Sequence, residues 1–189
     1  MNSHARVVVI GGGVVGVSTL YHLAKKGWSD VVLLERKELT SGSTWHAAGL
    51  LPLFNMSYSV GQIHKYSVRF YKELQEETGQ DVGFKTVSNI RLATNRDRMD
   101  EYYQYAGVAE TIGVKVNFLT PDEVKEVWPL CNIEGIVGAI QHPDDGYIQP
   151  ADLTQALAKG ARSRGATIHR NTAVIAIERT SGGEWLVKT

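Results

Sequence analysis

Several features that would define whole classes of protein are scarce or missing in this sequence. A single cysteine, Cys131, occurs among 189 residues, so no internal disulfide can form, and this predicts a reducing compartment. Neither sign of charge is in excess, because 20 Lys and Arg balance 20 Asp and Glu, which argues against nucleic acid or an anionic membrane as the main partner. No run of about 18 apolar residues is present, so we expect no membrane span.

Two further absences concern location and metals. The N-terminus enters an apolar run at Val7, which leaves no room for a signal or transit peptide. We therefore expect a cytoplasmic protein, or one of the mitochondrial matrix if a transit peptide was removed. The sequence has 6 histidines, among which His64 and His142 are candidate ligands or bases, but no metal-ligand spacing connects them, so we assign no metal.

What the sequence has instead is a glycine-rich turn close to its start. The apolar run at residues 7–10 predicts a strand that is buried on both faces, and glycines at 11, 13 and 16 complete the pattern G-x-G-x-x-G. In that pattern Gly11 permits a tight turn, Gly13 lets the backbone approach a diphosphate, and Gly16 allows a helix to pack closely on the strand. A glycine turn that only joins a strand to a helix, without a ligand, is the alternative.

The residues after the turn complete a nucleotide-binding pattern. An apolar stripe at helical spacing predicts a helix that ends at Gly27, and its members are Val17, Leu20, Tyr21 and Ala24. The N-terminus of such a helix favours phosphate. A second apolar run at 31–34 ends in Glu35, where a carboxylate can accept hydrogen bonds from ribose hydroxyls and disfavours a 2′-phosphate. This pattern predicts a site for an adenine dinucleotide and leaves NAD and FAD both open.

The stretch after the second strand, "RKELTSGSTWHAAGLLP", favours FAD. A nicotinamide dehydrogenase would normally continue here with another crossover helix. This chain instead runs through hydroxyl side chains and glycines to Pro52, which stops any regular element. Such a loop can pass beneath a dinucleotide and supply N–H and hydroxyl donors along its length, as an extended FAD would require.

Five segments of the sequence carry a resemblance to a known family. They are "VVVIGGGVVGVSTLYHLAKKG", "VVLLERKELTSGSTWHAAGLL", "YKELQEETGQDVGF", "SNIRLAT" and "DDGYIQPADLTQALAKGARSRGATI". Together they resemble the dimethylglycine and sarcosine dehydrogenase family, FAD enzymes of the D-amino-acid-oxidase-like class, over essentially the whole chain. The resemblance implies that His46 carries FAD covalently through the 8α-methyl group of the isoalloxazine. A histidine that only hydrogen-bonds within its loop is the alternative.

The same resemblance implies the other cofactor contacts, beside Gly11, Gly13 and Gly16 of the turn. Val14 and Val15 are expected against the diphosphate, and Glu35 and Arg36 beside the adenosine ribose. Val174 is expected to meet the adenine through its backbone, although its sequence pattern alone favours plain strand core. The flavin side is expected to be lined by Gly42, Ser43, Thr44, Trp45, His46, Ala47, Ala48, Gly49 and Leu50.

Residues 51–145 predict a mixture of helices and strands. Helices are expected at 58–78, 97–112 and 120–129, and strands at 84–94 and 135–143. Thr120 and Pro121 mark the start of the third of these helices. In the first of them, an apolar stripe is expected to face the core, namely Ile63, Tyr66, Phe70 and Leu74.

The end of the chain returns to the pattern of its start. Pro150 begins a helix that stops at Gly165, residues 166–170 predict a third parallel strand in the order 3-2-1, and a hairpin turns at 181–183. We therefore expect an α/β fold with a Rossmann-like FAD-binding domain of the glutathione-reductase and D-amino-acid-oxidase type. This domain is formed by residues 1–50 and 146–189 and is incomplete, and 51–145 form part of an inserted α+β substrate or cap domain.

The resemblance implies the N-terminal FAD part of an N-methylglycine dehydrogenase, so we expect the chain to be a fragment. In such an enzyme a hydride passes from an N-methyl carbon of dimethylglycine or sarcosine to the flavin, and the electrons leave to an acceptor flavoprotein or to oxygen. Tetrahydrofolate is implied only in a further C-terminal domain, and no catalytic residue is identifiable in this chain. The alternatives are another FAD-dependent amine or amino-acid oxidase and a non-catalytic regulatory flavoprotein homologue.

Overall fold

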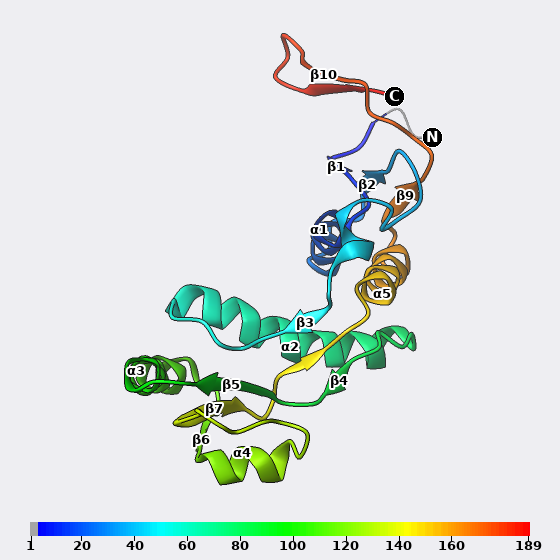
Figure 1. Ribbon diagram of the computed structural model, residues 1–189. Coiled ribbons are helices and arrows are strands. Elements are labelled where there is room, and N and C mark those ends of the chain that lie inside the picture. The colour runs from blue at the N-terminus through cyan, green and yellow to red at the C-terminus, as the bar shows by residue number, and fades with distance from the viewer. Residues whose placement is uncertain (1–3) are drawn as a thin grey trace. The chain divides into compact units, whose positions relative to one another are not determined.

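The computed structural model describes residues 4–189, and contacts between residues divide this chain into two compact units (Figure 1). The first unit holds the residues up to Gly49 together with the segments Glu73–Gly83 and Gln149–Thr189. The second unit holds Leu50–Lys72 and Phe84–Ile148. The expected division into 1–50, 51–145 and 146–189 did not include the segment Glu73–Gly83 in the first unit.

A three-stranded parallel sheet forms the centre of the first unit. Its strands are β1 (Val7–Ile10), β2 (Val31–Leu34) and β9 (Thr167–His169), and their order in the sheet is β1-β2-β9. The order expected from the sequence is therefore confirmed, with β9 running parallel to β2. Because all three strands run the same way, their carboxyl ends meet at one edge of the sheet, where loops of parallel sheets bind ligands.

Helices α1 (Val14–Lys25) and α5 (Pro150–Arg162) pack against each other in this unit. The predicted stripe of α1 is buried in full, namely Val17, Leu20, Tyr21 and Ala24. Burial of a large apolar side chain stabilises a fold by about 1.5–3 kcal/mol. Gly160 lets the two helices approach, since a Cβ atom at that position would lie 2.7 Å from the ring of Tyr21.

Tyr21 also explains why the end of helix α2 (Tyr58–Thr78) belongs to the first unit. Its hydroxyl donates a hydrogen bond of 2.8 Å to the carboxylate of Glu77, which lies in the last turn of α2. Arg164, just after α5, forms an ion pair of 2.8 Å with the same carboxylate. One carboxylate thus joins α1, α5 and the end of α2.

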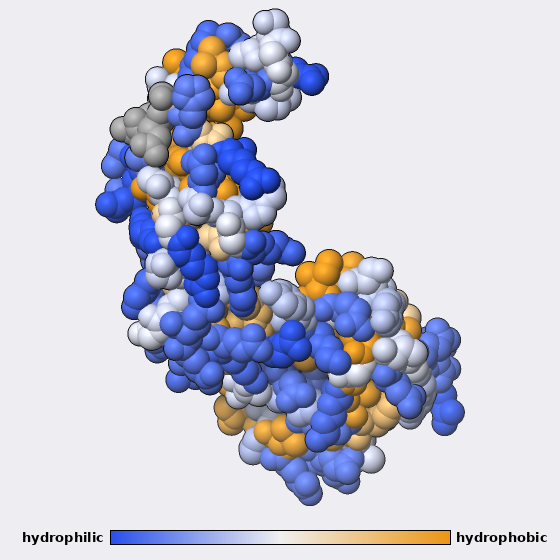
Figure 2. All heavy atoms as spheres, turned by 180° about the vertical axis from the view of Figure 1, so that it is seen from behind, coloured by the Kyte–Doolittle hydropathy of each residue, from blue (hydrophilic) through white to orange (hydrophobic). Residues whose placement is uncertain are grey.

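The last residues of the chain form a hairpin that stands apart from the parallel sheet. Strands β10 (Ala176–Arg179) and β11 (Trp185–Lys188) pair antiparallel in a sheet of their own, which confirms the predicted hairpin. Its apolar side chains are largely exposed, namely Ile177, Trp185 and Leu186. Figure 2 shows the resulting apolar surface among polar atoms at the top of the view.

The second unit contains two antiparallel sheets of three strands each. One has the order β3-β8-β4, with β3 (Leu50–Leu51), β8 (Gly146–Tyr147) and β4 (Lys85–Thr86). The other has the order β5-β7-β6, with β5 (Asn89–Ala93), β7 (Gly138–His142) and β6 (Asn117–Leu119). The core of this unit includes Tyr105, Ile112 and Ile140, which are fully or almost fully buried.

The helices of the second unit begin where side chains cap them. Helix α3 (Arg96–Ile112) follows Asn95, whose side chain accepts a hydrogen bond from the Arg98 N–H. Helix α4 (Pro121–Val127) starts with a capping box in which the Thr120 and Glu123 side chains bond each other's backbone N–H. The predicted start of α4 at Thr120 and Pro121 is confirmed.

Two expectations for this part of the chain were wrong. Only half of the stripe on α2 lies in a core: Phe70 and Leu74 are buried, whereas Ile63 and Tyr66 are 62% and 42% exposed. Apolar periodicity predicts which residues share a face and does not say whether another element covers that face. The strand expected at 84–94 is broken into β4 and β5 at Ser88, which has a φ of 69°.

Candidate functional site

The glycine turn after β1 disfavours side chains, at Gly11 through its backbone conformation and at Gly12 and Gly16 through close contacts. Gly11 has a φ of +106°, a conformation that residues with a side chain rarely adopt. A Cβ atom at Gly16 would lie 2.0 Å from the carbonyl oxygen of Gly11, so glycine is required where helix α1 passes the turn. At Gly12 a Cβ atom would lie 2.6 Å from the Leu39 side chain and 2.9 Å from that of Glu35. The role of Gly12 was missed in the sequence, where it is the middle glycine of three in a row.

The N-terminus of α1 has the features of an anion-binding site. No acidic residue lies in its first turn, and its N-cap, Gly13, contributes no side chain. The N–H groups at the start of a helix have no acceptor within the helix and carry a partial positive charge. One of them, that of Val14, donates a hydrogen bond of 2.9 Å to the Thr44 hydroxyl, and the neighbouring Val15 side chain is exposed.

Glu35 follows β2 directly, and its carboxylate contacts the glycine turn. One carboxylate oxygen accepts a hydrogen bond of 2.6 Å from the Gly12 N–H, and the other accepts one of 2.8 Å from the Lys37 N–H. Glu35 is only 9% exposed. The two N–H bonds therefore hold its carboxylate in one orientation. A carboxylate can accept about four hydrogen bonds. The two bonds from backbone N–H groups therefore leave acceptor sites free for hydroxyl donors of a ligand.

A cavity of about 200 Å³ lies next to this carboxylate. It brings together Glu35, Arg36 and Val174, which were all expected on the adenosine side of one ligand. The rest of its lining was not predicted, namely Ile10, Gly11, Leu34, Thr172 and Ala173. Backbone bonds hold the two walls together, because the Thr172 N–H donates to the Glu35 carbonyl at 2.8 Å.

The loop after β2 turns back onto the glycine turn. Within it, Ser43–His46 form a short 3₁₀ helix, η1, which contacts α5. The Trp45 and His46 rings lie with their centroids 4.0 Å apart, and Trp45 is 61% exposed. Of the expected flavin-side residues, only Thr44 is buried; Gly49 is half-buried, and the exposed ones are Gly42, Ser43, Trp45, His46, Ala47, Ala48 and Leu50. Leu50 lies in β3 of the second unit.

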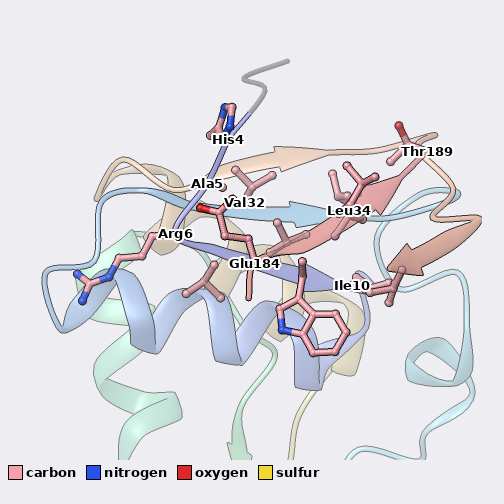
Figure 3. A pocket seen from close by; sticks show the side chains of 14 residues that line it. His4, Ala5, Arg6, Ile10, Val32, Leu34, Glu184 and Thr189 are labelled. Atoms are coloured by element: carbon pink, nitrogen blue, oxygen red, sulfur yellow. The ribbon is translucent and has the colours of Figure 1, made fainter. Parts of the chain in front are cut away.

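A larger cavity, of about 670 Å³, lies between the parallel sheet and the hairpin and shares Ile10 and Leu34 with the smaller one (Figure 3). Figure 3 shows Val32 and Leu34 of the sheet together with Glu184 and Thr189 of the hairpin segment around it. Most of its lining is aliphatic, and the N–H groups of the glycine turn are not part of it. The smaller cavity has the convergent polar groups that a nucleotide requires, so we place the candidate site there.

The second unit has a buried polar cluster around Asp145 and His142, which are 1% and 0% exposed. The Asp145 carboxylate accepts a hydrogen bond of 2.9 Å from the Leu53 N–H, and Nε2 of His142 lies 3.1 Å from the Tyr105 hydroxyl. Burial raises the pKa of Asp145 to about 6 and that of Tyr105 to about 12. Burial, with a smaller effect of the nearby Arg91 charge, lowers the pKa of His142 to about 4.

Features of a metal site and of a membrane span are both absent from the part of the chain that the structure describes. Across residues 4–189, no three His, Cys, Asp or Glu side chains come together in a way that would hold a metal ion. Within the same residues, no helix combines the length and the apolar character needed to cross a membrane. His64 instead bonds the Pro52 carbonyl through Nδ1, at 2.9 Å.

Comparison with known proteins gives a family match over nearly the whole chain. The family model described as FAD dependent oxidoreductase matches residues 6–189. The chain is 44% identical to human mitochondrial dimethylglycine dehydrogenase over 185 residues, which are 98% of this chain and 21% of that protein. It is 43% identical to human mitochondrial sarcosine dehydrogenase over 176 residues, 93% of this chain and 19% of that protein.

Solved structures agree with this match. The crystal structure of L-proline dehydrogenase from P. horikoshii superimposes with a TM-score of 0.89 at 29% identity, over 96% of this chain and 48% of that one. The chain thus spans about a fifth of the length of the curated relatives and about half of this structure.

Proposed function

Since the chain belongs to the family of FAD-dependent oxidoreductases, we propose that its glycine turn and the surrounding loops bind FAD. The diphosphate is held at the N-terminus of α1 beside Val14 and Val15, where the helix dipole and the free N–H groups favour negative charge. The Val14 N–H is not one of these donors, because it bonds the Thr44 hydroxyl. The Glu35 carboxylate accepts hydrogen bonds from the ribose hydroxyls. The adenine lies in the adjoining cavity against Arg36 and the backbone of Val174.

One observation carries this proposal, which is the cavity beside the glycine turn. Glu35 and Arg36 line it from one segment and Val174 lines it from another that is far away in the sequence. The carboxylate is fixed by two backbone N–H groups, so its orientation is set before a ribose arrives. The residues present therefore fit the adenosine half of FAD, and the acid disfavours the 2′-phosphate of NADP.

The flavin side is assigned to the loop from Gly42 to Leu50. Its small residues allow a large flat group to approach the backbone, and the exposed indole of Trp45 offers an apolar face. When bound, FAD supplies the capacity to accept a hydride from a carbon next to an amine nitrogen. The residues proposed for this side are Gly42, Ser43, Thr44, Trp45, His46, Ala47, Ala48, Gly49 and Leu50.

We further propose that His46 holds the flavin covalently. Its side chain is exposed, so an imidazole nitrogen is available for a bond to the 8α carbon of the isoalloxazine. This bond would replace the imidazole N–H and one C–H of the 8α-methyl group, and oxygen would be the oxidant that takes up the two electrons and two protons released. Such a bond prevents loss of the cofactor and raises its reduction potential. This assignment rests on the T-W-H-A-A-G match to the dehydrogenase family and on the accessibility of the ring.

For the reaction, we propose oxidative N-demethylation of an N-methyl amino acid such as dimethylglycine or sarcosine. Support comes from the two dehydrogenases at 44% and 43% identity. An acceptor flavoprotein or oxygen would then take the electrons, and no residue of this chain is assigned to tetrahydrofolate. Oxidation of a cyclic secondary amino acid is the second candidate, because the proline dehydrogenase structure matches 96% of the chain.

The cofactor proposal is tested with the purified chain and added FAD. We expect a yellow protein whose denatured mass increases by one FAD, located on the peptide that contains residues 41–52. His46→Ala should bind FAD and release all of it on denaturation, whereas His64→Ala, in the second unit, should keep the covalent flavin. A colourless wild-type protein contradicts FAD binding, and complete release of flavin from the wild type contradicts the covalent bond alone.

The substrate proposal is tested by anaerobic reduction of the bound flavin. Dimethylglycine, sarcosine and proline are added separately, and loss of the flavin absorption band is followed. Bleaching by the N-methyl amino acids alone supports the first candidate, and bleaching by proline alone supports the second. If none of them bleaches the flavin, this chain does not carry out either reaction, while the cofactor proposal stands.

A further inference from the structure

Thr44 differs from its neighbours in the loop that carries His46. Thr44 is 7% exposed, whereas all the remaining residues of the stretch 41–48 are exposed. Its hydroxyl accepts a hydrogen bond of 2.9 Å from the N–H of Val14, the first residue of α1. A Cβ atom at Gly13 would lie only 3.0 Å from the same hydroxyl oxygen, so Thr44 sits directly against the glycine turn.

A second backbone bond fixes the loop on the N-terminal side of Thr44. The Thr40 N–H donates to the Gly12 carbonyl at 3.0 Å, and Thr40 itself has a φ of 71°, which turns the chain sharply. On the other side, the Ala47 N–H donates to the Thr44 carbonyl at 3.2 Å and closes the 3₁₀ turn η1. The loop is thus attached to the glycine turn at residues 40 and 44.

His46 belongs to the same turn and has no such attachment of its own. Across residues 4–189 its imidazole makes no side-chain hydrogen bond, and its neighbour is the Trp45 ring at 4.0 Å between centroids. A 3₁₀ turn fixes the relative placement of its residues through its short, regular rise. The position of His46 relative to the start of α1 therefore depends on where Thr44 is held.

We infer that Thr44 is a positioning residue for the bond between His46 and FAD. Its hydroxyl, held on the Val14 N–H, sets the distance between the diphosphate site at the start of α1 and the imidazole that reaches the isoalloxazine. The 8α carbon of the flavin and the imidazole nitrogen of His46 must approach in one geometry for the bond to form. A displacement of about 1 Å between reacting groups can slow a reaction by about 100-fold. This inference rests on the proposed covalent attachment and adds a residue to which the family resemblance gives no separate role.

The test compares the rate of covalent attachment with the amount of FAD bound. Purified apo chain is mixed with saturating FAD, samples are denatured at successive times, and covalent flavin is measured by intact mass and by in-gel fluorescence. Total bound FAD is measured before denaturation. Thr44→Val removes the hydroxyl at nearly constant volume, and we expect attachment to slow by about 10- to 100-fold while saturating FAD still fills the site. Thr44→Ser should attach flavin at nearly the wild-type rate.

A second variant removes the same hydrogen bond from its donor side. Val14→Pro eliminates the N–H at the first helical position, where proline is well tolerated. It should slow attachment to the same degree as Thr44→Val, and the double variant should be no slower than either single one. Thr19→Val makes the same chemical change on the exposed side of α1 and should leave attachment unchanged. If Thr44→Val does not fold, Val14→Pro alone decides.

Three outcomes would overturn the inference. Attachment at the wild-type rate in both Thr44→Val and Val14→Pro would show that the hydroxyl is irrelevant to the bond. Slow attachment that higher FAD concentrations fully restore would mean that Thr44 only contributes binding affinity. A wild-type chain that binds FAD without any covalent bond would remove the proposed attachment and this inference together, and the time course distinguishes that case from the first two.

Discussion

The glycines of the turn are required for different reasons, which become visible only at the scale of single atoms. Gly11 needs its positive φ of 106°, whereas Gly12 lies beneath the side chains of Glu35 and Leu39. Gly16 faces the carbonyl oxygen of Gly11 across the contact between strand and helix. A side chain would therefore strain the backbone at the first position and overlap with neighbouring atoms at the other two.

Gly16→Ala tests the closest of these contacts. A methyl group 2.0 Å from the Gly11 carbonyl oxygen would force α1 away from β1, since both partners in this contact are backbone. Overpacking of this kind costs about 1–3 kcal/mol, and opening the turn would also disperse the N–H groups proposed for the diphosphate. We expect a lower free energy of unfolding in urea and at least tenfold weaker FAD binding by titration.

The control is the same substitution where the backbone does not require glycine. Gly107 lies within α3, where an added methyl group would meet no atom within 4 Å, and a glycine in a helix interior is less favourable than alanine by about 1 kcal/mol. Gly107→Ala should therefore stabilise the second unit and leave FAD binding unchanged. Equal effects of the two substitutions would contradict the steric explanation.

The sequence could predict those candidate site residues whose chemistry is tied to a fixed spacing. The glycines and Glu35 belong to that group, whereas the loop around His46 was predicted from the resemblance to the dehydrogenase family. Thr44 could not be singled out, because in the sequence it is one hydroxyl residue among Ser41 and Ser43. Its burial and its bond to Val14 depend on how two segments 30 residues apart pack together.

At the scale of elements, the long and regular ones were predictable and the short ones were not. Strands β1 and β2 and the buried face of α1 lie where the sequence predicts them, because each strand is one continuous apolar run and the helix repeats its period over several turns. The expectation that β1 is buried on both faces was wrong, since its first three residues are half-buried and Ile10 is 48% exposed. Strands β3, β4 and β8 have 2 residues each, so they contain no period to detect. Their pairing in one sheet is set by tertiary contacts, among them the bonds of Asp145.

Asp145 joins three segments of the second unit. Its carboxylate accepts the Leu53 N–H, and its backbone carbonyl accepts the N–H groups of Val87 and Ser88 at 3.1 and 2.9 Å. Burial is the main cause of the pKa shifts of both Asp145 and His142, and it raises the first and lowers the second. The two groups consequently respond to acid in opposite ways.

The signs follow from the direction of each pKa shift. The pKa of His142 falls from 6.5 to about 4 on folding, so its contribution to stability is complete above pH 6.5 and is lost as the pH falls toward 4. The pKa of Asp145 rises from 3.8 to about 6, so its contribution is complete below 3.8 and is lost as the pH rises through 6. Between pH 4 and 6 the two effects oppose each other.

Single substitutions should separate these two effects. Asp145→Asn keeps an acceptor for the Leu53 N–H and leaves the effect of His142 unopposed, so stability relative to wild type should fall as the pH decreases from 6 to 4. His142→Gln should show the reverse trend. The difference in free energy of unfolding between each variant and the wild type should change by up to about 1.4 kcal/mol per pH unit. Chemical unfolding at pH 4, 5, 6 and 7 measures this difference.

Subtracting the wild-type free energy of unfolding at each pH removes the contribution of all other carboxylates from the comparison. Asp100→Asn, on the exposed side of α3, changes the same functional group outside the cluster and serves as the control. Difference curves for Asp145→Asn and Asp100→Asn with the same shape would contradict the opposed titration of Asp145 and His142.

At the scale of the whole chain, exposed apolar surface is the main departure from an ordinary globular protein. The hairpin and the parallel sheet enclose the cavity of about 670 Å³, whose apolar walls include Ile10, Ile177 and Trp185 at 48%, 52% and 65% exposure. Apolar side chains that are exposed singly are common, but a contiguous group of this kind marks a surface that binds apolar molecules or promotes association.

We therefore expect the 189-residue chain to bind an apolar fluorescent dye such as anilinonaphthalene sulfonate at this cavity. Trp185→Gln removes the largest apolar side chain of the lining and should reduce the dye fluorescence by about half or more, because dye binding scales with contiguous apolar area. Trp128→Gln is the matched control, since Trp128 is 50% exposed and lies in the second unit, outside the cavity. If both variants reduce the dye signal equally, the apolar surface is dispersed over the chain and the cavity between hairpin and sheet does not act as a binding surface.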